Sequence, residues 1–303
     1  MAAHLAERSA MRIRLTAFVI TLLLLPPLAL LLSGVEQEIF TPIGGTTLLP
    51  ALLGSIAILI FSILLDTLTF HRNGHSLLRG QRGYLLWCCV AGAVTCLLLA
   101  YLNLFAGSWF TPANSDTAAL LLAALCGAFL LPAVLITRLW LAGVPGLVRL
   151  STRRLALPEL PAETAANILL LAVMVGLIGG TVWIDRLGWL FWASPLLLLV
   201  ALQLLWHEST IFSGLPRGDW SRVLLGSISG ILIGGIALAT YRMSDGAIYI
   251  AANPWQLIAA FALFGLLCLQ VSDVVAENWR GKSRGEVFKR KPFPIPIVTK
   301  KDE

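Results

Sequence analysis

Histidine side chains are the first candidates for chemistry in a chain that is otherwise strongly apolar. Residues 70–83, FHRNGHSLLRGQRG, hold two of the four histidines, His71 and His75, with an Asn-Gly pair between them. Two imidazoles four residues apart on a helix can share a metal ion. Asn-Gly favours a turn, however, and breaks that helical spacing. We therefore interpret the stretch as a polar loop and predict no metal and no cofactor.

A larger set of polar side chains recurs at the ends of apolar runs, on the side assigned to the cytoplasm below. The last run carries polar residues at i, i+3, i+7 and i+10 from Gln270 to Arg280, which places them on one helical face. We expect Arg138 to be the counter-ion of Asp66 and Asp273. Two interpretations stay open: a structural layer of ion pairs, or a shallow site for a headgroup or small solute. The predicted polar cluster consists of Asp66, His71, Arg138, Gln203, His207, Glu208, Asp273 and Glu277.

Sequence motifs of enzymes and ion pumps are missing. HEST at 207–210 lacks the second histidine of HExxH, and neither GxSxG nor a P-loop occurs. The centres of the apolar runs hold almost no ionisable residue, which disfavours an ion-coupled pump. We predict a non-catalytic accessory subunit of a membrane complex, or a carrier of an apolar or amphiphilic solute. Two alternatives stay open: an enzyme acting on a lipid headgroup at the cytoplasmic face, with Asp66, His71, His207, Glu208 and Asp273, and a quinone- or haem-binding redox anchor.

Composition places the chain among membrane proteins. Hydrophobic residues make up 58% of its 303 residues and charged residues 13%, with a mean hydropathy of +0.85. Soluble domains have about 45–50% apolar and about 25% charged residues. A membrane-spanning helix needs about 20 apolar residues, and eight runs meet that length. We predict an all-α polytopic transmembrane helix bundle with spans at 15–33, 48–70, 84–107, 117–141, 165–183, 187–206, 220–240 and 254–274.

Basic residues orient these spans. With eight spans, 20 of the 22 lysines and arginines fall on one side of the membrane. The positive-inside rule then places both termini in the cytoplasm, and we expect a bacterial-type inner membrane. All ten tryptophans lie within a turn or two of a span end, as in an aromatic belt. The predicted domains are a basic N-terminus (1–14), an eight-helix transmembrane domain (15–274) and a basic C-terminal tail (275–303).

Partners follow from the tail and from small residues within the spans. Each Lys or Arg near the cytoplasmic leaflet adds about 1 kcal/mol of attraction to anionic lipid, so the tail explains the pI near 9.3 without nucleic acid. Small residues four apart let helices approach closely. We expect this packing to lie inside the chain, with a homodimer or a partner membrane protein as the alternative. The predicted packing glycines are Gly176, Gly180, Gly226, Gly230 and Gly234.

Overall fold

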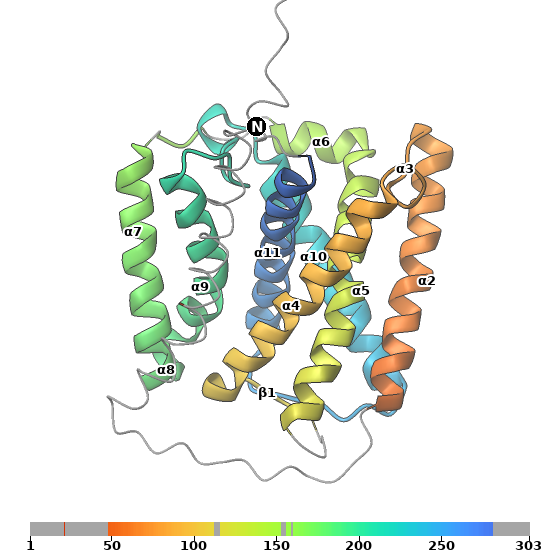
Figure 1. The fold of residues 1–303 in the computed structure, drawn as a ribbon, viewed down its shortest axis with the longest axis horizontal. Coiled ribbons are helices and arrows are strands. Elements are labelled where there is room, and N and C mark those ends of the chain that lie inside the picture. The colour runs from red at the N-terminus through yellow and green to blue at the C-terminus, as the bar shows by residue number, and fades with distance from the viewer. Residues whose placement is uncertain (1–20, 22–47, 112–115, 153–155, 159, 281–303) are drawn as a thin grey trace, which may run out of the picture.

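The protein is an all-α multi-pass membrane protein, as predicted. The computed structural model describes residues 21, 48–111, 116–152, 156–158 and 160–280 (Figure 1). Seven helical segments in this part of the chain are long and apolar enough to cross a membrane. Each coincides with one of the predicted runs after the first. The first run, apart from Thr21, and the tail beyond residue 280 lie outside the described residues.

Short helices and two very short strands connect the seven spans. Trp183 alone separates α8 (Gly180–Val182) from α9 (Ile184–Leu205), so the fifth and sixth predicted spans form a tight helical hairpin. The spans are α2 (Leu48–Asn73), α4 (Arg82–Ala106), α5 (Asp116–Ala142), the run of α7 (Ala162–Met174), η1 (Val175–Gly179) and α8 (Gly180–Val182), then α9 (Ile184–Leu205), α10 (Ser221–Met243) and α11 (Pro254–Arg280). The connecting elements are α3 (Leu77–Gly80), β1 (Trp109–Phe110), α6 (Pro145–Thr152), η2 (Leu215–Arg217) and β2 (Tyr249–Ile250).

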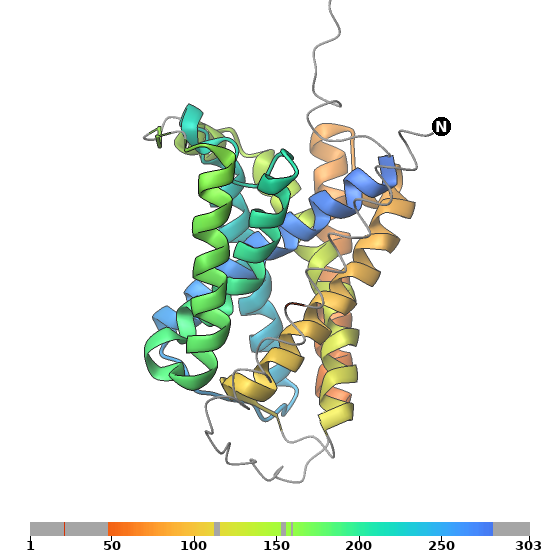
Figure 2. The ribbon, with the colours of Figure 1, turned by 60° about the vertical axis from the view of Figure 1, so that its left-hand side comes forward.

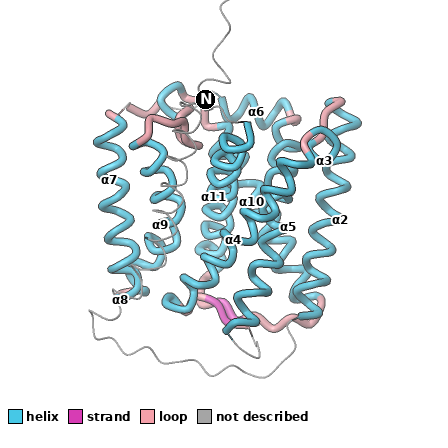
Figure 3. The backbone as a smooth tube through the Cα atoms, in the orientation of Figure 1, coloured by secondary structure: helices cyan, strands magenta, loops and turns pink. Residues whose placement is uncertain are grey.

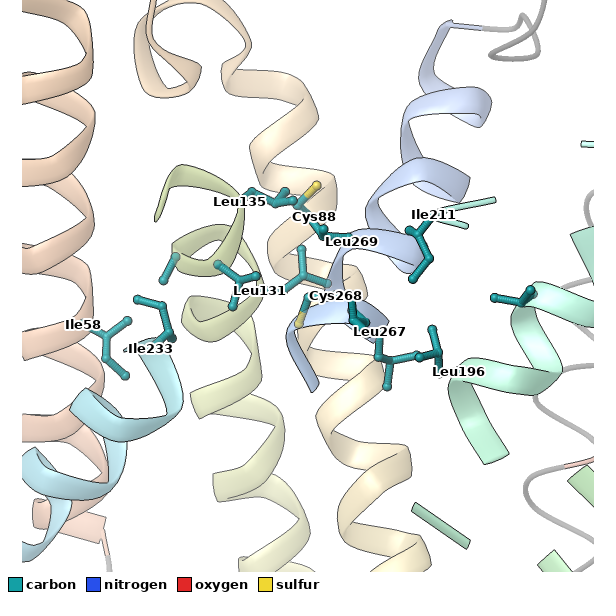
Figure 4. Close-up of a cluster of buried hydrophobic side chains, with 14 residues drawn as sticks. Ile58, Cys88, Leu131, Leu135, Leu196, Ile211, Ile233, Leu267, Cys268 and Leu269 are labelled. Carbon is teal, nitrogen blue, oxygen red and sulfur yellow. The ribbon is translucent and has the colours of Figure 1, made fainter. Parts of the chain in front are cut away.

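The helices form two groups that both contact α11: α7 and α9 make up one group, and α2, α4, α5 and α10 the other. The hairpin of α7 and α9 stands on one side, α2 lies on the far side, and α4, α5, α10 and α11 lie between them (Figures 1 and 2). Buried side chains of α2, α4, α5, α9, α10 and α11 meet in one apolar cluster in the middle of the bundle (Figure 4). The outer faces stay apolar as well, because lipid replaces water around them. On α2, for example, Ile56, Ile60 and Leu64 are all exposed.

Glycines set how closely the helices cross. On α10, Gly230 lies against the backbone of α11, where a Cβ added to it would come within 2.6 Å of the Gly265 Cα. Gly92 on α4 lies in the same way against Gly127 on α5. The structure places the three predicted glycines of α10 against α11, and Gly176 and Gly180 against α9. These close faces are thus occupied by helices of the same chain.

Charge distinguishes the two ends of the bundle. We call the end that carries α3, α6 and the α9–α10 connection the basic end (Figure 1). The described arginines at this end include Arg79, Arg149 and Arg217, whereas Arg186 and Arg242 lie at the opposite end. By the positive-inside rule, we predict that the basic end faces the cytoplasm.

The opposite end is closed by the strand pair and an asparagine. Strand β1 pairs with β2 in antiparallel fashion, the only strands among the described residues (Figure 3). The Asn103 side chain accepts hydrogen bonds from the backbone N–H groups of Ser108 (2.9 Å) and Trp109 (3.2 Å), and its amide donates to the Trp109 carbonyl at 2.7 Å. Asn103 therefore stabilises the end of α4, since its side chain supplies the hydrogen bonds that the turn lacks.

Candidate functional site

Polar side chains from α5, α9, α10, α11 and the α9–α10 connection meet at the basic end. Arg138 and Gln203 lie near the ends of α5 and α9, and Arg222 lies in the first turn of α10. Thr210 lies in the α9–α10 connection, and Gln270 and Asp273 lie in the second half of α11. We call this set the polar network. It consists of Arg138, Gln203, Thr210, Arg222, Gln270 and Asp273.

An ion pair between α10 and α11 forms the centre of the network. The Arg222 guanidinium donates to the Asp273 carboxylate, and the two side chains are only 14% and 16% exposed. Arg222 also donates to the Thr210 carbonyl at 3.4 Å. We expected Arg138 to be the counter-ion of Asp273. The direct ion pair of Asp273 is with Arg222, and Arg138 interacts with the same carboxylate electrostatically. Arg222 was missing from the predicted cluster because it stands at the very start of an apolar run, where a basic residue ordinarily marks orientation.

Arg138 stands beside this ion pair without joining it. It interacts electrostatically with Arg222, Asp273 and Asp219. The Asp219 carboxylate accepts a hydrogen bond from the Ser221 N–H at 2.9 Å, at the start of α10. The buried Nε atoms of Arg138 and Arg222 have no hydrogen-bond partner in the described part of the chain. Two guanidinium groups therefore keep donors available although both nearby carboxylates are engaged.

Two buried glutamines extend the network toward α9. The Gln270 amide donates to the Gln203 Oε1, and the Gln270 Oε1 accepts from the Ile211 N–H at 3.0 Å. The two glutamine residues are 0% and 2% exposed. This arrangement leaves the Gln203 Nε2 without a partner among the described residues. Because Ile211 follows Thr210, a continuous set of contacts joins Gln203 to Arg222.

Unsatisfied buried donors are concentrated here. Buried polar atoms in proteins are nearly always hydrogen-bonded to protein, ordered water or a ligand. Leaving one such group unpaired costs about 1–3 kcal/mol. Five side-chain atoms in the network, or next to it in the chain, lack a partner within the described residues, and every one can donate: Thr137 Oγ1, Arg138 Nε, Gln203 Nε2, Ser209 Oγ and Arg222 Nε.

Other members of the predicted polar cluster lie elsewhere or have backbone roles. Asp66 is 3% exposed, and its carboxylate accepts from the Leu77 and Leu78 N–H groups at 3.0 and 3.3 Å, which caps α3. His71 is exposed near the end of α2 and packs edge-on against Phe70. The Asp66 carboxylate thus binds backbone N–H groups of α3, whereas we expected Arg138 as its counter-ion.

The remaining predicted residues follow α9 or lie on α11. His207 is exposed and has a φ of 55°, the left-handed conformation that ends many helices. The Glu208 N–H donates to the Gln203 carbonyl at 2.9 Å. Glu277 is 8% exposed, one turn beyond Asp273 on α11. A residue that sequence reasoning missed, Tyr84 on α4, donates to the Ser272 carbonyl at 3.2 Å and so ties α4 to α11.

Neither metal ligands nor relatives indicate a function. Within the described ranges, no group of three or more His, Cys, Asp or Glu is placed to hold a metal ion. No protein-family model, curated protein or solved structure matches this chain. The polar network itself is therefore the basis for inferring what the protein does.

Proposed function

We propose that the protein is a non-catalytic carrier that binds an anionic amphiphilic molecule at its cytoplasmic face, with Arg138 and Arg222 as the binding residues. The observation that carries this proposal is the pair of buried Nε donors on two neighbouring arginines. A guanidinium has five donors and no acceptor, and carboxylates and phosphates match its geometry. An anionic group would supply the acceptors that both Nε atoms lack.

An amphiphile suits the location better than a wholly polar solute. The network lies at the basic end of a bundle whose outer helices, such as α2 and α7, expose apolar side chains. A ligand with an apolar tail would keep the tail among lipid and present its charged group at the membrane surface. Arginine side chains near that surface attract anionic headgroups.

The enzyme and redox alternatives receive less support from the geometry. A headgroup enzyme would need Asp66, His71, His207, Glu208 and Asp273 around one substrate. Asp66 caps α3, Asp273 is engaged with Arg222, and both histidines are exposed. His71 lies at the end of α2 and His207 follows α9, and both are exposed. At these positions the two imidazoles would not enclose a haem.

The accessory-subunit alternative can be separated from the carrier by purification. The glycine faces that could have formed a seam with another protein are filled by helices of the same chain. A subunit would still bring a second protein in fixed stoichiometry after mild detergent extraction. A carrier would bring lipid or another amphiphile.

The decisive experiment compares the molecules that copurify with three forms of the protein, analysed by mass spectrometry. We expect wild type to retain an anionic amphiphile above its level in the membrane, and Arg138→Gln to lose it. Arg217→Gln is the matched control because Arg217 is an exposed arginine at the same end. Identical amphiphile content in all three forms would contradict the proposal.

A further inference from the structure

We infer that the anionic group is a phosphate and that Gln203 is the residue that selects it over a carboxylate. This inference rests on the proposed function and names the ligand class of the same site. It starts from the amide of Gln203, whose Nε2 is buried, lacks a partner among the described residues and belongs to a residue only 2% exposed.

Three of the five available atoms can only donate, namely the Nε atoms of Arg138 and Arg222 and the Nε2 of Gln203, whereas the Thr137 and Ser209 hydroxyls can also accept. Both glutamine Oε1 atoms are occupied, one by the Gln270 amide and the other by the Ile211 N–H. The Asp273 carboxylate is occupied by Arg222. A headgroup that must donate hydrogen bonds, such as an amine, would find only these two hydroxyls as available acceptors. A group that only accepts could use any of the five atoms as a donor.

The number and placement of the five donors favour phosphate over other groups that only accept hydrogen bonds. The donors come from α5, α9, α10 and the α9–α10 connection, so they approach from different helices. A carboxylate has two oxygens in one plane, whereas a phosphate ester has up to three terminal oxygens in tetrahedral directions. Arg138 and Arg222 would bind two of these oxygens and Gln203 would donate to the third.

Gln203 is held in place for this role by its own contacts. Its Oε1 accepts from Gln270, which is fixed in turn by the Ile211 backbone. The Nε2 is therefore oriented by the same contacts that join α9 to α11. Gln203 acts as a specificity residue, and Arg138 and Arg222 provide the charge.

The test measures binding to the full-length protein in phosphatidylcholine nanodiscs. The probes are phosphatidic acid, oleate and inorganic phosphate. We expect phosphatidic acid to bind wild type about tenfold more tightly than oleate, a difference of about 1.4 kcal/mol. Gln203→Met should remove that preference by weakening phosphatidic acid alone. Asn167→Leu is the matched control, because it removes an exposed amide near the same end of the neighbouring helix α7.

A second variant keeps the test decisive if Gln203→Met unfolds. Gln203→Glu retains the oxygen that accepts from Gln270 but replaces the donor with an acceptor, and it should likewise lose the preference for phosphate. Equal binding of phosphatidic acid and oleate by wild type, with both lost in Arg138→Gln, would overturn the phosphate inference and leave the proposed function standing. Anion binding that is insensitive to Arg138→Gln would overturn both.

Inorganic phosphate identifies the source of the phosphate group. If it displaces phosphatidic acid from wild type and binds Gln203→Met more weakly, the phosphate inference holds with a soluble phosphate as ligand. If it does not displace the lipid while the preference over oleate is present, the inference holds with a lipid headgroup as ligand.

Discussion

Arg222 in the first turn of α10 forms an ion pair with Asp273 on α11, and through the Thr210 carbonyl it also contacts the α9–α10 connection. One side chain thus ties together three parts of the basic end. Arg138 stands alongside and adds a second positive charge. The pair is shielded enough that losing one partner leaves a poorly solvated charge.

Replacing Asp273 by Asn should destabilise the protein. We expect the free energy of unfolding to fall by about 2 kcal/mol, because Arg222 and Arg138 would then share a largely buried position without the Asp273 carboxylate. Thermal unfolding in detergent measures the loss. Glu163→Gln, an exposed carboxylate on α7, is the control and should change little.

The double variant Arg222→Gln/Asp273→Asn tests whether the effect belongs to the pair. Its loss should be smaller than the sum of the two single losses, because residues in contact are not additive. Strict additivity would show that the ion pair contributes nothing of its own.

The crossing of α10 and α11 should not tolerate a methyl group at Gly230. A Cβ there would meet the Phe261 carbonyl and the Gly265 backbone, which cannot move aside as a side chain could. We expect Gly230→Ala to lower the free energy of unfolding by about 1–3 kcal/mol, as overpacked cores do. The measurement is thermal unfolding in detergent together with the yield of monodisperse protein.

Gly235 on the same helix provides the control. Nothing lies within 4 Å of a Cβ added at this position. Gly235→Ala should therefore be neutral or stabilising by up to about 1 kcal/mol, since alanine favours helix more than glycine. A similar loss in both variants would mean that helix propensity, and not the crossing, decides stability.

Asp66 should act as a helix cap and not through its charge. Asp66→Asn retains an oxygen that can accept from the Leu77 and Leu78 N–H groups, whereas Asp66→Ala leaves both without that acceptor. We expect Asp66→Ala to cost about 1–2 kcal/mol in unfolding free energy and Asp66→Asn clearly less. Equal losses in the two variants would instead assign the effect to the negative charge.

The two ends of the bundle should be accessible from opposite sides of the membrane. In a background without the native cysteines, His75→Cys reports on the basic end and Ala252→Cys on the other, and both positions are exposed. A membrane-impermeant maleimide should label Ala252→Cys on intact cells. It should label His75→Cys only after permeabilisation. The reverse pattern would invert the orientation.

Hydropathy and basic residues were sufficient to predict seven of the spans. A helix in lipid must satisfy its own backbone hydrogen bonds over about 20 residues. Each span can therefore be recognised from its own run of apolar residues, without knowledge of its neighbours. The first predicted span, at 15–33, lies outside the described residues apart from Thr21 and stays a prediction.

The partners of the polar residues could not be predicted in this way. Asp66 and Asp273 both looked like partners of Arg138, yet one caps α3 and the other pairs with Arg222. Each span is apolar on all sides in lipid, so its pattern does not reveal which face meets which neighbour. Those contacts depend on how the helices cross, as at Gly230 and Gly265. The crossings bring Arg222 rather than Arg138 to Asp273 and place Gln203 against Gln270.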